Sequence, residues 1–231
     1  MKYFLVFLTL ISFAISGFSQ SFELWNSIGA NYKLNDQVFI SANFTPRMGD
    51  GKVQSFFPEA SVKYKLVKWA HVSLDYRLVS KREDNGNYLS ANRLNFNLKL
   101  RNAFKRLKYS FRFRYQMSSS GNSGASYESD FDEAFRFKPS VSYKIKKSIF
   151  EPKFGLDFFY NPTRGVYGQR FDKIRYSLGS SIDLGGAHGL IVSLKLDQKF
   201  NSSKNGSKLI FAIGYEADLK KLLKGSRPSS L

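Results

Sequence analysis

Apolar and polar residues alternate along almost the whole chain after residue 20. In the first such segment, from Phe22 to Leu34, the apolar side chains share one parity, whereas most polar and small side chains share the other. A period of two places the two sets on opposite faces of a β-strand. The alternation recurs near residues 22–34, 38–44, 56–66, 72–78, 94–100, 107–117, 135–145, 150–160, 174–184, 190–196 and 209–219. The pattern therefore predicts eleven strands and no helix of note.

The two strand faces differ in charge, and this difference decides which face points outward. The polar face carries Asp and Glu together with an excess of Lys and Arg, whereas the apolar face carries no charge. Tilted strands of about 11 residues match the thickness of a bilayer. A soluble barrel of this size would enclose more space than its side chains fill. We predict an all-β, antiparallel, up-and-down transmembrane β-barrel of about 10 to 12 strands with its apolar face outward. A soluble periplasmic β-protein is the alternative.

The connections between the predicted strands alternate in length. Short turns are expected at residues 35–36, 67–70, 102–106, 146–148 and 185–188, and longer polar loops at 47–54, 81–90, 118–133, 161–172 and 201–207. Short turns face the periplasm in bacterial barrels, and single-chain barrels have an even number of strands. Here the first and last strands would both run from the exterior toward the periplasm. We therefore expect either a missed strand or one segment that lies outside the wall.

The N-terminal residues have the features of a targeting segment. Met1 to Gln20 contain one lysine, an apolar run and a small-x-small pattern that ends at Ser19. These features are typical of a secretory signal peptide, and the apolar run is shorter than the roughly 20 residues that a transmembrane helix needs. We expect a signal peptide at 1–19, an outer-membrane barrel at 20–219 and a basic C-terminal tail at 220–231.

The amino-acid composition excludes several classes of chemical function and partner. The formal net charge is +18, the sequence pI is about 9.9 and there is no cysteine. Disulfides, cysteine-ligated metals and thiol nucleophiles are thus excluded. Such a charge would favour nucleic acid in a cytoplasmic protein, but the signal peptide removes that context. The two histidines, His71 and His188, fall at short turns, away from where a barrel hydrolase meets its substrate. We expect no enzyme, no cofactor, no metal and no nucleic-acid partner.

Three segments of the chain are similar to a known family. They are LWNSIGANYKLND at 24–36, KKSIFEPKFGLDFFYNPTRG at 146–165 and FDKIRYSLG at 171–179. They resemble the domain-of-unknown-function family 2490 of secreted bacterial proteins. The resemblance implies an outer-membrane β-barrel and supplies no activity. Many outer-membrane proteins end on an aromatic residue, whereas this chain ends on a basic tail.

The inward charges are the one set of residues with a physical argument for binding. Alignment of neighbouring strands predicts structural ion pairs between Glu59 and Arg77, between Lys144 and Glu151, and between Asp157 and both Lys138 and Arg175. Four arginines on successive strands have few carboxylates between them: Arg93, Arg112, Arg114 and Arg136. A strip of positive charge attracts small anions into a low-dielectric interior.

Two functions from different classes follow from this arrangement. The first is a non-enzymatic outer-membrane barrel with a narrow, anion-preferring pathway or binding cavity, whose partners are outer-membrane lipid and small anions. The alternative is a structural or surface-interaction barrel that acts through its extracellular loops, chiefly residues 118–133. A tolerated, wet interior without a specific ligand is the simpler interpretation of the basic strip.

Overall fold

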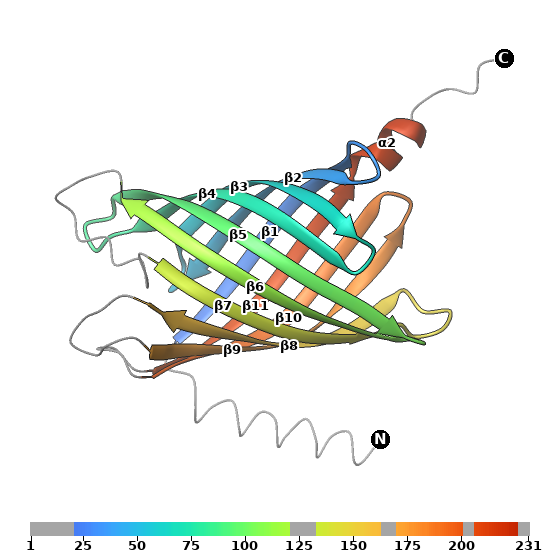
Figure 1. The fold of residues 1–231 in the computed structure, drawn as a ribbon. Coiled ribbons are helices and arrows are strands. Elements are labelled where there is room, and N and C mark those ends of the chain that lie inside the picture. The colour runs from blue at the N-terminus through green and yellow to red at the C-terminus, as the bar shows by residue number, and fades with distance from the viewer. Residues whose placement is uncertain (1–20, 121–132, 163–169, 201–205, 226–231) are drawn as a thin grey trace, which may run out of the picture.

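The computed structural model describes residues 21–120, 133–162, 170–200 and 206–225, and these form a closed β-barrel (Figure 1). The signal peptide expected at 1–19 lies outside the described residues, as do residues 226–231 of the expected tail. The strands are β1 (Ser21–Lys33), β2 (Val38–Gly49), β3 (Lys52–Val67), β4 (Ala70–Arg82), β5 (Tyr88–Phe104), β6 (Leu107–Ser120), β7 (Glu133–Tyr143), β8 (Phe150–Asn161), β9 (Arg170–Gly185), β10 (His188–Lys199) and β11 (Gly206–Asp218).

The barrel closes through a parallel pair. Each strand pairs antiparallel with the next along the chain, but β1 pairs with β11 in parallel, from Ser21 opposite Lys208 to Asn31 opposite Asp218. All eleven described strands therefore belong to the wall. The expectation of a missed or excluded strand is wrong. A barrel with an odd number of strands can close when its first and last strands run in the same direction, as they do here. The fully antiparallel order fails only at this pair.

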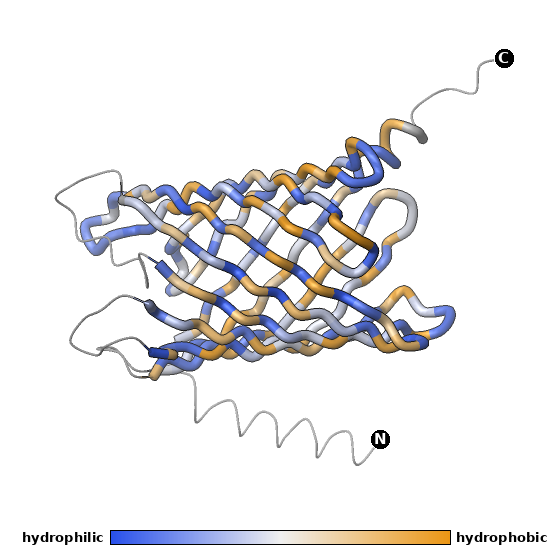
Figure 2. Tube along the Cα trace, in the orientation of Figure 1, coloured by the Kyte–Doolittle hydropathy of each residue, from blue (hydrophilic) through white to orange (hydrophobic). Residues whose placement is uncertain are grey.

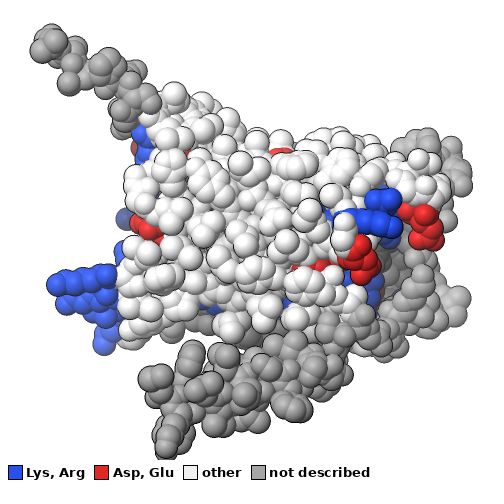
Figure 3. Space-filling view, turned by 180° about the vertical axis from the view of Figure 1, so that it is seen from behind, with Lys and Arg blue, Asp and Glu red and all other residues white. Residues whose placement is uncertain are grey.

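Side chains are distributed inside out relative to a soluble protein. Large apolar residues such as Phe44, Val62 and Leu178 are exposed on the outer face, whereas Asp75 and Asp157 are buried inside. Hydropathy alternates from residue to residue along the strands (Figure 2), and most charged side chains visible from behind gather at the two ends of the barrel (Figure 3). The assignment of the apolar face to the outside is confirmed.

The two ends of the barrel differ in their connections. At the turn side, short connections join β1 to β2, β3 to β4, β5 to β6, β7 to β8 and β9 to β10. The opposite end is the loop side. There the expected loop at 47–54 is wrong, since only Asp50 and Gly51 separate β2 from β3, with φ of 52° and 69°. Positive φ at both residues is the geometry of a two-residue hairpin, which Asp-Gly adopts readily. Residues 47–49 consequently belong to the wall.

A short helix follows the last strand at the turn side. Helix α2 (Leu219–Gly225) contacts β1 and β11, and the carboxylate of Asp218 accepts a hydrogen bond from the Lys221 amide at 3.1 Å. A carboxylate at this position satisfies one of the free N–H groups of the first helical turn. The first part of the expected tail is thus helical. None of the described helices is long and apolar enough to cross a bilayer.

Candidate functional site: the interior of the barrel

The four arginines of the predicted basic strip do come together inside the barrel. Arg93 lies on β5, Arg112 and Arg114 lie on β6, and Arg136 lies on β7. Arg114 stands directly opposite Arg136, and Arg112 stands opposite Lys138. Like charges directly opposite each other across two strands are destabilising. The strip therefore needs anionic groups nearby.

Carboxylates from other strands supply much of this compensation. Arg114 Nη2 lies 2.9 Å from Asp75 Oδ2, and Arg114 Nε donates to Asn97 Oδ1 at 2.6 Å. Arg136 Nη2 lies 2.5 Å from Asp157 Oδ2, while Arg112 reaches the same oxygen at 3.4 Å. The premise that few carboxylates serve this strip is therefore wrong for Arg112, Arg114 and Arg136. Arg93 Nε donates to Ser118 Oγ at 3.0 Å.

The other predicted ion pairs divide between confirmed and corrected. Arg77 and Glu59 are paired at 2.5 Å, as expected. Asp157 does stand opposite Arg175 in the register, but the guanidinium of Arg175 turns to Asp197 on β10, so Asp157 pairs with Arg136 and Arg112 instead. Lys138 makes no ion pair with Asp157 within the described residues. The carboxylate of Glu151 binds Lys108 and Ser142 rather than Lys144.

Aromatic rings at inward-facing strand positions form a second feature, which the sequence pattern did not predict. Arg47 lies 3.6 Å above the ring centre of Trp25, and the side chains of Arg175 and Lys195 each lie 4.8 Å from it. Arg47 also covers Phe57 at 4.2 Å. We refer to these rings and the cations that cover them as the cation–aromatic belt, which consists of Trp25, Phe57, Phe159, Arg47, Arg77, Arg136, Lys173, Arg175 and Lys195.

The belt fills the interior at its level. The rings of Trp25, Phe57 and Phe159 are only 7%, 5% and 4% exposed. They come from β1, β3 and β8, so side chains from opposite parts of the wall meet here. Arg175 contacts both Trp25 and Phe159, so among the described residues the side chains of this level pack against one another across the interior.

Two cations of the belt have no anionic partner. In the part of the chain that the structure describes, Arg47 and Lys195 make no ion pair and no side-chain hydrogen bond, and Arg47 Nε is buried without an acceptor. A ring face attracts a cation by about 0.5–2 kcal/mol but leaves its N–H donors unsatisfied. A buried charge without a partner costs several kcal/mol. An oxyanion would satisfy these donors.

The alternation of apolar and polar residues in the sequence marks these aromatic residues as unusual. Trp25, Phe57 and Phe159 occupy positions of the polar parity, where a large aromatic residue is unusual. The predicted loop at 47–54 includes Arg47, so the sequence pattern alone does not show its inward position. Once the Asp50-Gly51 hairpin is recognised, Arg47 falls on the inward parity of β2.

The two histidines lie near the turn side, as their positions in the sequence predict. His188 Nδ1 is 2.5 Å from the hydroxyl of Tyr215, and His71 is buried on β4 between Lys65 and Lys99 in the register. No group of three or more His, Asp or Glu residues arranged for a metal ion occurs among the described residues.

Comparison with known proteins gives a family but no activity. The family described as "Protein of unknown function (DUF2490)" matches residues 22–207, which extend from β1 into the first residues of β11. No curated protein matches the sequence. Because the match spans most of the barrel and far more than half of the chain, the protein belongs to the DUF2490 family.

Proposed function

We propose that the protein is a non-enzymatic outer-membrane β-barrel whose interior binds small oxyanions. The apolar outer face, the charged ends and the signal peptide expected at 1–19 support the membrane location. An exposed apolar band around a barrel with a polar interior is typical of outer-membrane proteins. The short turns then face the periplasm, and the loop side faces the exterior.

One observation carries the binding proposal: Arg47 and Lys195 share the ring of Trp25 and make no ion pair with a carboxylate among the described residues. The nearest carboxylate on the same strand as Trp25 is occupied, because Glu23 accepts hydrogen bonds from Trp25 Nε1 at 2.7 Å and from Lys208 at 2.5 Å. A guanidinium matches an anion with several oxygens better than a monatomic ion, since its N–H groups bind two oxygens at once.

The belt favours binding over free passage. Its rings are buried, so an anion that reaches Arg47 from the loop side meets side chains rather than an open path. We therefore expect the protein to hold an anion and to pass little steady current in a planar bilayer. A large anion-selective conductance would contradict the filled interior and favour the pathway.

Calorimetry with inorganic sulfate and phosphate tests the site in protein folded into detergent micelles. The double variant Arg47→Met and Lys195→Met keeps much of the apolar volume and removes both unpaired charges. We expect it to lose at least about tenfold in affinity, because each hydrogen bond to a charged group contributes about 1.5–3 kcal/mol. The stability of the wild type should rise with anion concentration.

The matched control removes two other inward lysines. Lys63 and Lys65 lie at the turn-side end of β3, so the variant Lys63→Met and Lys65→Met has the same net charge as the test variant. We expect it to bind sulfate like the wild type. An equal loss in both variants would show diffuse attraction without a site. A wild type that binds neither anion would instead support a structural or surface-interaction barrel.

A further inference from the structure

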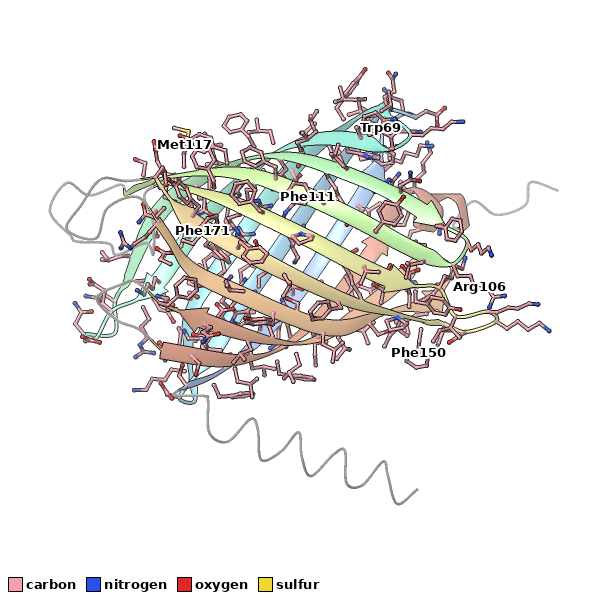
Figure 4. All side chains as sticks on the ribbon, turned by 60° about the horizontal axis from the view of Figure 1, so that its bottom comes forward. Trp69, Arg106, Phe111, Met117, Phe150 and Phe171 are labelled. Carbon is pink, nitrogen blue, oxygen red and sulfur yellow. The ribbon has the colours of Figure 1, made fainter. Side chains whose placement is uncertain are left out.

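A pocket of about 520 Å³ indents the outer wall near the turn side. It extends over β5, β6, β7 and β8, and its lining includes outward apolar residues from each of these strands: Leu100, Phe111, Pro139, Val141, Phe154 and Leu156. Trp69, in the turn between β3 and β4, also lines the pocket and is exposed. Figure 4 shows Trp69 and Phe111 projecting outward from the same side of the barrel, with Arg106 at the turn side.

Pro139 explains why the wall is indented here. The pairing of β7 with β8 is interrupted between Phe137 opposite Phe158 and Ser140 opposite Gly155. Proline has no N–H group for the ladder, so the pairing fails where it stands. Its side chain is also shorter than the surrounding aromatic ones. The result is a concave apolar surface among large side chains that otherwise form a convex wall.

The turns beside this pocket carry only positive charge. Exposed cations occupy the connections β3–β4, β5–β6 and β7–β8: Lys68, Lys105, Arg106, Lys144, Lys146 and Lys147. None of them has an ion pair within the described residues. The other two turn-side connections differ, because Asp36 pairs with Lys33 in one and Asp183 accepts a hydrogen bond from Gly185 beside the other. The basic turns are therefore grouped on the side of the pocket.

We infer that this pocket binds an anionic glycerophospholipid of the periplasmic leaflet, with an acyl chain in the pocket and the phosphate among the basic turns. Leu100 lies five residues from Lys105, which is about 16 Å along a strand and less in depth because the strand is tilted. This separation suits a headgroup above and an acyl chain below. Trp69 and Tyr109 are amphipathic residues of the kind that lie at the level of headgroups. The inference rests on the proposed membrane location.

The two tryptophans of the chain provide the probe. Trp69 lies at the pocket, whereas Trp25 is buried in the interior. In the variant Trp25→Phe, folded into vesicles, the fluorescence of Trp69 reports directly on lipids at the pocket. Dibrominated phosphatidylglycerol and dibrominated phosphatidylcholine quench by contact and are compared at equal mole fractions. We expect the anionic lipid to associate several times more strongly, since each basic residue at a membrane surface contributes about fivefold.

Three variants on the Trp25→Phe background locate the site. Arg106→Gln with Lys147→Gln should remove most of the preference for phosphatidylglycerol. Val141→Phe should reduce it as well, because the larger side chain occupies the pocket while the charges remain. Lys220→Gln with Lys221→Gln also removes two turn-side cations, but in α2, away from the pocket, and should preserve the preference. Each variant must show the β-sheet circular dichroism of the folded barrel.

The outcomes separate this inference from the proposed location. Equal quenching by the two lipids would overturn the lipid site while leaving the barrel in the membrane. A preference that survives both Arg106→Gln with Lys147→Gln and Val141→Phe would also overturn it. If neither lipid quenched Trp69 and the barrel did not float with the vesicles, the membrane location itself would be wrong; if it did float, the lipid site alone would be overturned. In the reverse variant, Trp69→Phe, we expect both lipids to leave Trp25 unquenched.

Discussion

The carboxylate of Asp157 is shared by two guanidinium groups in the interior of the barrel. Asp157 is 1% exposed and lies 2.5 Å from Arg136 and 3.4 Å from Arg112. Replacement by Asn would leave two partly buried cations facing each other without their common anion. We expect Asp157→Asn to lower the free energy of unfolding by about 3–5 kcal/mol, measured by urea titration of the barrel in lipid vesicles.

A double-mutant cycle identifies which cation matters. Arg136→Met combined with Asp157→Leu replaces the pair by apolar side chains and should recover part of the loss. Lys138→Met combined with Asp157→Leu should recover less, because Lys138 makes no ion pair with this carboxylate. Greater coupling to Lys138 than to Arg136 would contradict the arrangement of the network.

The charged pairs show how far sequence reasoning reaches at this scale. Register predicts which residues stand opposite each other, and this suffices for Glu59 and Arg77. It fails for Arg175, which stands opposite both Asp157 and Asp197, one on each side, and which binds Asp197. Arginine side chains are long enough to choose between neighbours, so alternation alone does not determine the partner.

At the scale of the strands, a glycine allows β9 and β10 to approach each other closely. A Cβ atom at Gly179 would lie 2.4 Å from the carbonyl oxygen of Val192 and 2.8 Å from Ser193 Cα, so the backbone would have to move. We expect Gly179→Ala to destabilise the barrel by about 1–3 kcal/mol, as overpacked sites do. Urea titration in vesicles measures the effect.

Gly189 offers the matched control in the same strand pair. The nearest atoms to a Cβ there lie 3.9 Å and 4.0 Å away, so a methyl group fits. Gly189→Ala should leave stability unchanged or raise it by up to about 1 kcal/mol, because alanine has fewer unfolded conformations. Equal effects at the two glycines would show that the close approach of β9 and β10 at Gly179 does not constrain the wall.

The strands can be predicted from the sequence because each depends on the local alternation of apolar and polar residues. A period of two is visible within any short segment, and all eleven predicted strands are found in the structure. The hairpin at Asp50 and Gly51 differs from the predicted loop, because the polar composition of residues 47–54 favours a loop whereas the Asp-Gly pair favours a two-residue turn. Closure was not predictable, since the pairing of β1 with β11 joins segments almost 190 residues apart and no local pattern encodes it.

At the scale of the whole molecule, the distribution of apolar and charged side chains indicates which solvent surrounds the outer face of the barrel. The outer face exposes apolar residues all around the wall while charged groups occupy the interior and the ends. Monomeric soluble proteins rarely expose contiguous apolar surface of this extent. A bilayer removes this surface from water, and the polar backbone is satisfied because the closed barrel has no free edge. The depth dependence of a charge on the outer face therefore distinguishes the two solvents.

Two leucines on one strand measure that dependence. Leu178 lies near the middle of β9 and is 63% exposed, and Leu184 lies on the same face near the turn side and is 53% exposed. In a bilayer, arginine costs about 2–4 kcal/mol at mid-depth and about 0–1 kcal/mol near the interface. We expect Leu178→Arg to destabilise the barrel in vesicles by that larger amount and Leu184→Arg to have little effect. In water both exposed positions would accept arginine within about 0.5 kcal/mol, so equal tolerance would exclude the transmembrane barrel.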